Sequence, residues 1–416
     1  MGKSAYFHFA FTLLLILTAG CQPGSKESPP VVGDLRVEYM TNPLGVDLSR
    51  PRFSWKIISQ ERGVAQGSWR IIVGKSLSEV RKGQGSQWDS GRKEGDVTIN
   101  HEYAGAPLED HTTYYWRAGI LLANGREVWS KPGFFQTGII DSAKWQARWI
   151  TTPSAIVHEC PLLRKTFTVG KKVDRAVAYV TACGFYEFFV NGKKVGDHVL
   201  DPGITDYRKT VLYSTYDVTS LIRKGENAAG AMLGNGAWNL RKTEGRWSWG
   251  SGEDTFGNPC FLMQLVITFK DGSQSVIVSD ETWKSTPGPI TFNNLYGGED
   301  YDARRELPGW AEKGFDDTAW TSVVVAQGPG GALKSQLMPA IKVTATLDPI
   351  RQINPEKGVY LFDLGQNMAG WWRLEVKGSP GQVIRIRGAE TLNDSLFPKP
   401  LEEEDRLSTK FKYHAE

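Results

Sequence analysis

The sequence predicts an all-β chain built from tandem β-sandwiches. The clearest strand and turn signals lie between Tyr179 and Tyr207, in YVTACGFYEFFVNGKKVGDHVLDPGITDY. The 45 glycines and 21 prolines among 416 residues suit short strands joined by many turns. No helical periodicity of useful length occurs after the first residues of the chain, so helices are not expected to build a core.

The segment with the clearest signals predicts a β-hairpin. Apolar residues are concentrated over 176–190, and Asn191-Gly192 then supplies two residues that accept positive φ. The return strand around Val195 ends at Asp201-Pro202-Gly203, where proline fixes φ and glycine tolerates a left-handed conformation. The chain is therefore expected to turn again at this point, and no helix fits here.

Residues 1–21 are predicted to be a lipoprotein signal peptide. Lys3 precedes an apolar run over 7–17 that is too short to span a bilayer. The ending Leu17-Thr18-Ala19-Gly20-Cys21 resembles the bacterial lipobox, which makes Cys21 the expected site of lipidation and membrane anchoring. The alternative is an ordinary cleaved signal with an incidental cysteine. Residues 22–34 are expected to be a flexible tether, and the chain is expected at the cell envelope, on the outer membrane or facing the periplasm in a Gram-negative cell.

Composition and charge narrow the range of partners. The formal net charge is +3 with both signs interspersed, which gives no electrostatic footprint for nucleic acid and favours a neutral ligand.

Cys160, Cys183 and Cys260 form no C-x-x-C pair and no metal-ligand spacing with histidine, so neither a metal nor a cofactor is expected. One disulfide among these three cysteines remains an alternative to buried thiols, which are favoured because Cys183 lies in an apolar strand.

The body of the chain divides into three predicted domains, over 35–140, 141–330 and 331–416. In the first, Trp55, Trp69 and Trp116 fall at inward-facing strand positions and are expected in the core. The last domain ends in polar residues over 398–416 without alternation, so it is expected to be incomplete. The expected strands are 52–58, 68–73, 112–121 and 134–137 in the first domain, 228–233 in the second, and 341–346, 358–363, 370–376 and 382–388 in the third.

Four blocks of sequence resemble the N-terminal region of bacterial α-L-rhamnosidases, in that family's order. They are GFYEFFVNGKKVGDHVLDPGITDY, RKGENAAGAMLGNGAW, YGGEDYDARRELPGW and FDLGQNMAGWWRLEVKG. The resemblance implies a fibronectin type III-like sandwich over 35–140, a jelly-roll sandwich over 141–330 and the start of a concanavalin-like sandwich over 331–416. In that family the chemistry resides in a following (α/α)6 barrel, and no segment of this chain resembles one.

One loop of the second domain could hold a sugar. Gly234 to Trp238 leads into a polar loop with two more tryptophans, and an indole can stack on a sugar while neighbouring Asn and Arg side chains bond its hydroxyls. The alternative is that these rings pack against the sandwich or a neighbouring domain. The predicted sugar-binding residues are Trp238, Asn239, Arg246, Trp247 and Trp249.

The acidic segment GGEDYDARRELPGW invites a catalytic interpretation. Glu299, Asp300 and Asp302 could serve as acid and base in glycoside hydrolysis. The segment resembles a catalytic motif of the family that also ends in Gly-Trp, but it lies in the sandwich region. We therefore expect surface or interdomain ion pairs here and predict no catalytic residue.

These expectations lead to one principal function and two alternatives. The chain is expected to be the N-terminal, non-catalytic portion of an α-L-rhamnosidase-type glycoside hydrolase acting on rhamnose-containing glycans, and to be inactive by itself. One alternative is a surface lipoprotein that binds such glycans without hydrolysis. The other is a sandwich that serves protein contact only.

Overall fold

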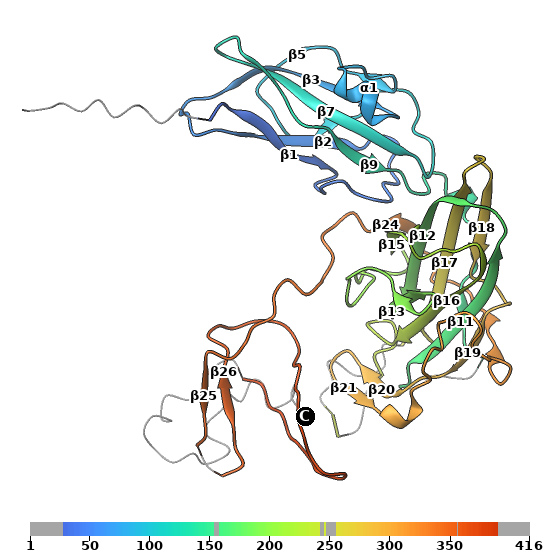
Figure 1. The fold of residues 1–416 in the computed structure, drawn as a ribbon. Helices are drawn as coiled ribbons and strands as arrows, with labels where there is room; N and C mark the ends of the chain where they lie inside the picture. Colours follow the sequence, from blue (N-terminus) through green and yellow to red (C-terminus); the bar gives the residue numbers. More distant parts are fainter. Residues whose placement is uncertain (1–27, 154–157, 242–244, 247–254, 356, 390–416) are drawn as a thin grey trace, which may run out of the picture.

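The computed structural model describes residues 28–153, 158–241, 245–246, 255–355 and 357–389. Within these ranges the chain is nearly all β, which confirms the predicted fold class (Figure 1). The helices there are one α-helix, α1 (Leu77–Arg81), and two 3₁₀ turns, η1 (Ser142–Lys144) and η2 (Ala303–Arg305). None of the described helices has the length and apolar character that a membrane crossing requires.

The first sandwich contains two sheets. Its strands are β1 (Val31–Val37), β2 (Arg52–Ile58), β3 (Gln66–Gly74), β4 (Trp88–Asp89), β5 (Lys93–Glu94), β6 (His101–Glu102), β7 (Thr113–Leu122), β8 (Glu127–Trp129) and β9 (Gly133–Gln136). One sheet has the order β1-β2-β6, and the other has the order β4-β3-β7-β8 with β5 on β3 and β9 on β7.

Aromatic residues from both sheets form the core of this sandwich. Trp55 and Trp116 are fully buried, and Trp69 packs against the same cluster, as their strand positions predicted. Phe53 meets Trp116 edge to face with ring centroids 4.7 Å apart. Such pairs add to the free energy gained by burying the rings, so these tryptophans stabilise the fold.

The second sandwich is larger. Its strands are β10 (Ile150–Thr151), β11 (Pro161–Val169), β12 (Val173–Cys183), β13 (Phe185–Val190), β14 (Lys193–Lys194), β15 (Thr210–Asp217), β16 (Gly225–Gly234), β17 (Cys260–Phe269), β18 (Gln274–Val278), β19 (Lys284–Pro287), β22 (Thr321–Ser322), β23 (Val324–Val325) and β24 (Ala332–Ser335). One sheet has the order β23-β10-β17-β12-β15-β24 with β18 on β17, and the other has the order β14-β13-β16-β11-β19-β22. Apolar side chains from both sheets form one buried cluster between them.

The apolar segment over 176–190 belongs to two strands in different sheets. The sequence suggested one continuous apolar stretch, but the chain leaves β12 at Cys183 and enters β13 at Phe185. Gly184 makes this switch with φ 105°, a conformation that L-residues with a Cβ avoid. The predicted hairpin is confirmed, because β13 pairs with β14 across Asn191 (φ 49°) and Gly192 (φ 78°).

Polar contacts join the first two sandwiches. The Ser335 N–H donates to Asp47 Oδ2 at 2.8 Å in a buried position, and His111 Nδ1 lies 2.6 Å from the Tyr179 hydroxyl. Arg175 Nη1 donates to Thr113 Oγ1 at 2.5 Å. These contacts link residues from the first sandwich with residues of the second, so the two sandwiches share a hydrogen-bonded interface.

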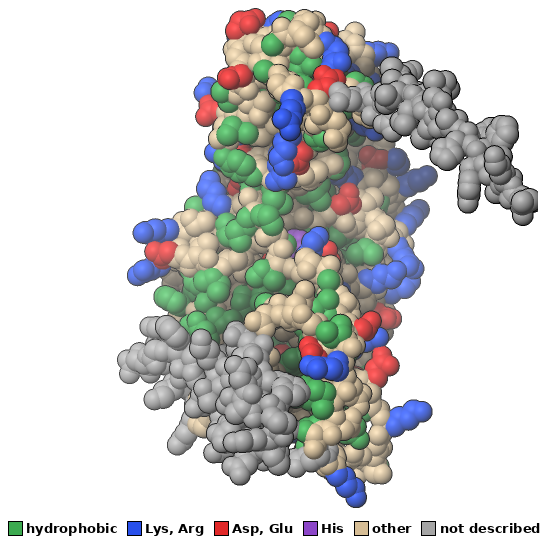
Figure 2. Space-filling view, turned by 90° about the vertical axis from the view of Figure 1, so that its left-hand side faces the viewer, with side chains coloured by type: hydrophobic (Ala, Val, Ile, Leu, Met, Phe, Trp, Pro, Cys, Tyr) green, Lys and Arg blue, Asp and Glu red, His purple; other side chains and the backbone are tan. Residues whose placement is uncertain are grey.

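The C-terminal described segment forms less sheet than the sequence predicts. β25 (Arg351–Ile353) and β26 (Leu361–Asp363) pair with each other, but the strands expected over 341–346, 370–376 and 382–388 are not formed. Alternation places side chains on one face but does not supply the neighbouring strand whose N–H and C=O groups complete a ladder. Trp371 and Val383 are accordingly 61% and 88% exposed. Figure 2 views the molecule from the left-hand side of Figure 1 and shows hydrophobic side chains gathered around the middle of that face.

Candidate functional site

Trp238 lies inside the protein, just after β16. The chain turns at Asn235-Gly236, where Gly236 has φ 51°, and the Trp238 side chain is then 6% exposed. Its ring stacks on Phe256 with centroids 5.0 Å apart and meets the edge of Tyr207 at 5.2 Å. The indole N–H donates to the Asn258 carbonyl at 2.9 Å. These contacts match the packing interpretation, and the predicted sugar-binding role of Trp238 stays a prediction that they do not support.

Asn239 is buried in a network of amides. Its Nδ2 donates to Asn235 Oδ1 at 2.7 Å, and its Oδ1 accepts from Thr255 Oγ1 at 2.7 Å and from Arg241 Nε at 3.2 Å. Asn235 in turn donates to the Asn293 carbonyl at 2.9 Å. The side chain of Asn239 is therefore occupied in holding its own loop against β20 (Ile290–Asn294), which leaves it poorly placed to bond a sugar hydroxyl.

Among the predicted sugar-binding residues that the structure describes, Arg246 is the one whose side chain reaches the surface. Its Nη2 donates to Asp300 Oδ2 at 2.6 Å, and its Nη1 donates to the Gly297 carbonyl at 3.2 Å. The guanidinium also lies 3.9 Å from the ring centroid of Phe292. The arginine thereby connects the loop to the hairpin of β20 and β21 (Gly298–Tyr301). Trp247 and Trp249 lie outside the described residues, as does Cys21.

The acidic segment that runs through β21 and beyond it forms local ion pairs. Asp302 accepts hydrogen bonds from Arg304 N at 3.1 Å and Arg304 Nε at 2.8 Å, and these bonds lower the pKa of Asp302 to about 2. Tyr301 donates to Glu306. Burial, with a smaller contribution from the charge of Glu187, raises the pKa of Glu299. The contacts of Asp302 and Arg304 are those that the ion-pair interpretation predicts.

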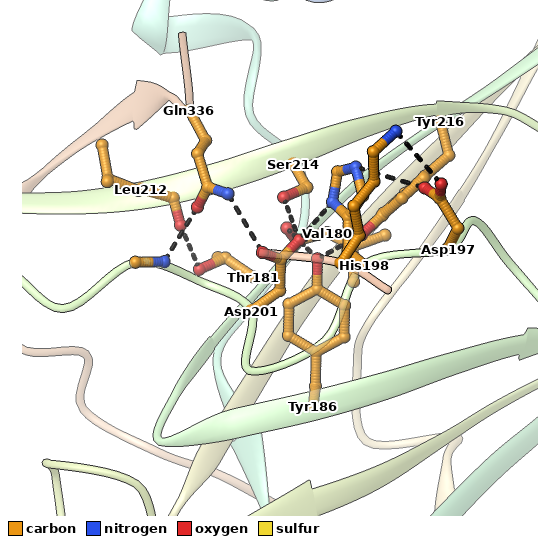
Figure 3. A network of polar contacts seen from close by, with 12 residues as sticks. Val180, Thr181, Tyr186, Asp197, His198, Asp201, Leu212, Ser214, Tyr216 and Gln336 are labelled. Carbon is orange, nitrogen blue, oxygen red and sulfur yellow. Dashed lines mark hydrogen bonds and ion pairs between the residues drawn. The ribbon is translucent and has the colours of Figure 1, made fainter. Parts of the chain in front are cut away.

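A buried polar network surrounds Asp201 on the loop between β14 and β15 (Figure 3). Asp201 Oδ2 accepts from His198 Nδ1 at 2.6 Å, Ser214 Oγ at 2.7 Å and the Tyr216 hydroxyl at 3.1 Å. Its Oδ1 accepts from Gln336 Nε2 at 3.0 Å. The sequence marked Asp201-Pro202-Gly203 only as a turn, because three of the four donors come from β15 and from Gln336, which no local pattern connects to the loop.

The protein's own donors occupy both oxygens of the Asp201 carboxylate. Burial opposes its ionisation, but hydrogen bonds from His198, Ser214 and Gln336 outweigh burial and hold the pKa of Asp201 below its usual value. An acid or base needs a free position for the transferred proton, and four donors already surround this carboxylate. The Asp201 network is therefore a structural anchor rather than a site of proton transfer.

The same network ties the second sandwich to the chain that leads into the C-terminal segment. Gln336 Oε1 accepts from Gly203 N at 2.8 Å, and Val199 N donates to the Ile341 carbonyl at 2.9 Å. Lys342 Nζ lies 3.3 Å from Asp197 Oδ2. These bonds fix the path of residues 336–342 along the sandwich.

The described side chains provide no evident metal centre. Across the ranges that the structure covers, no three His, Cys, Asp or Glu side chains gather closely enough to hold an ion.

Three family models match the chain in consecutive stretches. The model of the Rha78A-like N-terminal immunoglobulin domain matches residues 32–141, and that of the α-L-rhamnosidase N-terminal domain matches 171–345. The bacterial α-L-rhamnosidase concanavalin-like domain matches 353–410.

Curated relatives and solved structures agree with these matches. An α-L-rhamnosidase of Formosa agariphila is 33% identical over 94% of this chain and 44% of its own length, and one of Alteromonas sp. is 32% identical over 94% and 43%. The chain thus spans less than half the length of these two relatives.

Two solved structures are similar over most of the chain. The α-L-rhamnosidase from Dictyoglumus thermophilum superposes with a TM-score of 0.73 at 38% identity, over 81% of this chain and 39% of that one. The Streptomyces avermitilis α-L-rhamnosidase complexed with L-rhamnose gives 0.79 at 25% identity, over 92% and 52%.

Proposed function

Because the chain belongs to the α-L-rhamnosidase family, we propose that it forms the N-terminal, non-catalytic β-sandwich portion of a glycoside hydrolase acting on rhamnose-containing glycans. The observation that carries the proposal is the succession of three family domains along an all-β chain. A rhamnose-containing ligand is supported by the similarity to the α-L-rhamnosidase of Formosa agariphila and to the Streptomyces avermitilis enzyme complexed with L-rhamnose.

The contacts of the carboxylates support a non-catalytic role for this portion. Glycoside hydrolysis needs one carboxylic acid to protonate the leaving oxygen and a second carboxylate on the other side of the bond. Asp302 is engaged by Arg304, and Asp201 is saturated by its own donors. Neither carboxylate is disposed to exchange protons with a bound glycan.

Hydrolysis of an aryl α-L-rhamnoside by the purified 416-residue chain tests this role. We expect no release of the aryl group above the uncatalysed rate, with a complete α-L-rhamnosidase as the positive control. Turnover at enzyme-like rates that survives further purification would contradict the non-catalytic assignment.

A second function, glycan binding without hydrolysis, is favoured by the position of Arg246. Its side chain is 31% exposed and that of Asp300 is 50% exposed, so a polar pair lies at the surface beside the predicted sugar loop. Planar guanidinium and carboxylate groups bond sugar hydroxyls well, and these two are already oriented by each other and by Phe292.

Calorimetry with L-rhamnose and rhamnose-containing oligosaccharides tests this second function. We expect Arg246→Ala to weaken binding by roughly tenfold or more, the loss of one charged hydrogen bond. Arg304→Ala, at a 90% exposed arginine with its own aspartate partner, is the matched control and should bind like the wild type. Equal affinity of both variants would remove Arg246 from the site, and no heat with any of these sugars would favour protein contact as the role of the sandwich.

We also propose that Cys21 is lipidated and holds the protein at the cell envelope. The support is the lipobox-like sequence before Cys21 and the polar stretch that follows it. The wild-type protein should incorporate labelled palmitate and sediment with membranes, whereas Cys21→Ala should lose both properties. A variant that keeps the label would exclude Cys21 as the anchor.

A further inference from the structure

Cys183 and Cys260 lie directly opposite each other in the second sandwich. Cys183 is the last residue of β12 and Cys260 is the first residue of β17, and the antiparallel register pairs them. The two positions are far apart in the sequence, so only the sheet brings them together. Both are free thiols in the structure.

The pairing meets the geometric requirements of a disulfide. Directly opposed residues of antiparallel strands have Cα atoms about 4.5–5.5 Å apart and side chains on the same face of the sheet. A disulfide joins Cα atoms that are about 4.4–6.8 Å apart. The two sulfur atoms can therefore be joined with little movement of β12 or β17.

The surroundings favour a bond between these two thiols over any other pairing. Both side chains are buried in one apolar cluster with Tyr207, Val211 and Trp238. Cys160 belongs elsewhere, because its sulfur accepts a hydrogen bond from Asn293 Nδ2 at 2.8 Å. The third cysteine is thus occupied outside the cluster that holds the pair.

We propose that Cys183 and Cys260 are a redox pair that forms a cross-strand disulfide in the presence of a disulfide oxidant, with Cys160 remaining a free thiol. This modification site goes beyond the proposed function and does not depend on it. The bond would fasten the end of β12, next to the Gly184 switch, to the start of β17, within the buried cluster that also contains Trp238.

The oxidation is a balanced thiol–disulfide exchange. One cysteine thiolate attacks oxidised glutathione, which forms a mixed disulfide and releases one glutathione thiol. The second cysteine then attacks the mixed disulfide, which closes the protein disulfide and releases the other glutathione thiol. Contact with Cys260 and burial raise the pKa of the Cys183 thiol in the folded protein, so exchange is fastest while the chain folds.

Refolding in a glutathione redox buffer tests the proposal. The full chain is unfolded and reduced, refolded with reduced and oxidised glutathione, and then alkylated in denaturant and digested. We expect a peptide pair joined through Cys183 and Cys260 in most molecules, and alkylated Cys160. Alkylation of both Cys183 and Cys260, or a bond that includes Cys160, would overturn the proposal.

Thermal unfolding of the oxidised and reduced wild-type chains supplies a second readout. The oxidised chain should unfold at a temperature about 5 °C or more above that of the reduced chain, because the bond constrains the unfolded state. Cys260→Ala should abolish this difference, and Cys160→Ala, at an equally buried cysteine, should keep it. Equal midpoints for the oxidised and reduced wild-type chains would contradict the proposal even if Cys260→Ala does not fold.

Discussion

Asp201 is a buried carboxylate that accepts hydrogen bonds from four donors, one on its own loop, two on β15 and one at Gln336. Asp201→Asn keeps the shape but places an amide N–H₂ among groups that donate, so we expect the free energy of unfolding to fall by about 2–4 kcal/mol. Urea unfolding at pH 7 measures this loss. Asp197→Asn, at a 68% exposed aspartate on the same loop, should leave the unfolding midpoint nearly unchanged, and equal losses in both variants would contradict the anchor.

The same residue sets a pH dependence. The pKa of Asp201 is lowered in the folded state, so its contribution to stability is fully present above the unfolded-state pKa of about 3.9 and is lost as the pH falls through the folded pKa. The difference between wild type and Asp201→Asn should therefore narrow below about pH 4. A constant difference from pH 7 to pH 3 would show that the carboxylate's charge is not the cause.

For Trp238, the sequence predicts the loop but not whether the ring is buried. The glycine-rich loop and its tryptophan were identifiable, and a sugar-binding or a packing role was open. Burial of the ring depends on Tyr207 and Phe256, which arrive from other segments, and a loop has no periodicity that assigns a side chain to the inside. Asn239 and Arg246 belong to the same predicted set, yet Asn239 is buried and Arg246 is 31% exposed, because contacts with other segments decide which loop side chain faces inward.

At the scale of elements, Gly184 decides that β12 and β13 enter different sheets. The prediction of strands and of the Asn191-Gly192 turn succeeded because composition and turn chemistry are local. The switch at Gly184 was not predictable, because an apolar run has the same pattern whether one sheet or two receive it. The strands expected over 370–376 and 382–388 failed for a related reason, since a strand needs a partner that its own sequence does not encode.

Replacing Gly184 by alanine should destabilise the second sandwich. A Cβ at this position would meet the Gly234 carbonyl oxygen at 2.3 Å, in addition to the strain of φ 105°. We expect a loss of about 2 kcal/mol or more in the free energy of unfolding, measured by urea denaturation.

Gly225→Ala is the matched control for this substitution. Gly225 has φ 93°, but a Cβ there has no heavy atom within 4 Å, so only the backbone strain applies. The loss in Gly225→Ala should therefore be clearly smaller. Equal losses in the two variants would show that the close approach to Gly234 is unimportant.

At the scale of the whole molecule, Asp47 links the first sandwich to the second. Burial raises the pKa of Asp47, although the bond from Ser335 N and the charge of Lys334 oppose this. A raised carboxyl pKa means that the free energy of unfolding falls as the pH rises from the unfolded-state value toward the folded pKa. The ionised Asp47 carboxylate therefore lowers the free energy of unfolding at neutral pH.

Asp47→Asn should remove this destabilisation. The asparagine oxygen can still accept from Ser335 N, so at pH 7 we expect a thermal midpoint equal to or above that of the wild type, and the advantage should disappear near pH 4. Asp47→Ala removes the acceptor and should lower the midpoint. A lower midpoint for Asp47→Asn at pH 7 would contradict a raised pKa for this carboxyl group.

We propose that the chain is the N-terminal portion of a larger α-L-rhamnosidase. This proposal is tested most directly by immunoblotting native cell envelopes with an antibody against the first sandwich. We expect a polypeptide about twice the 46.3 kDa of the 416-residue chain, because the chain spans only 44% of the Formosa agariphila relative. A band near 46.3 kDa would contradict this proposal, and glycan binding by the sandwiches alone would become the principal question.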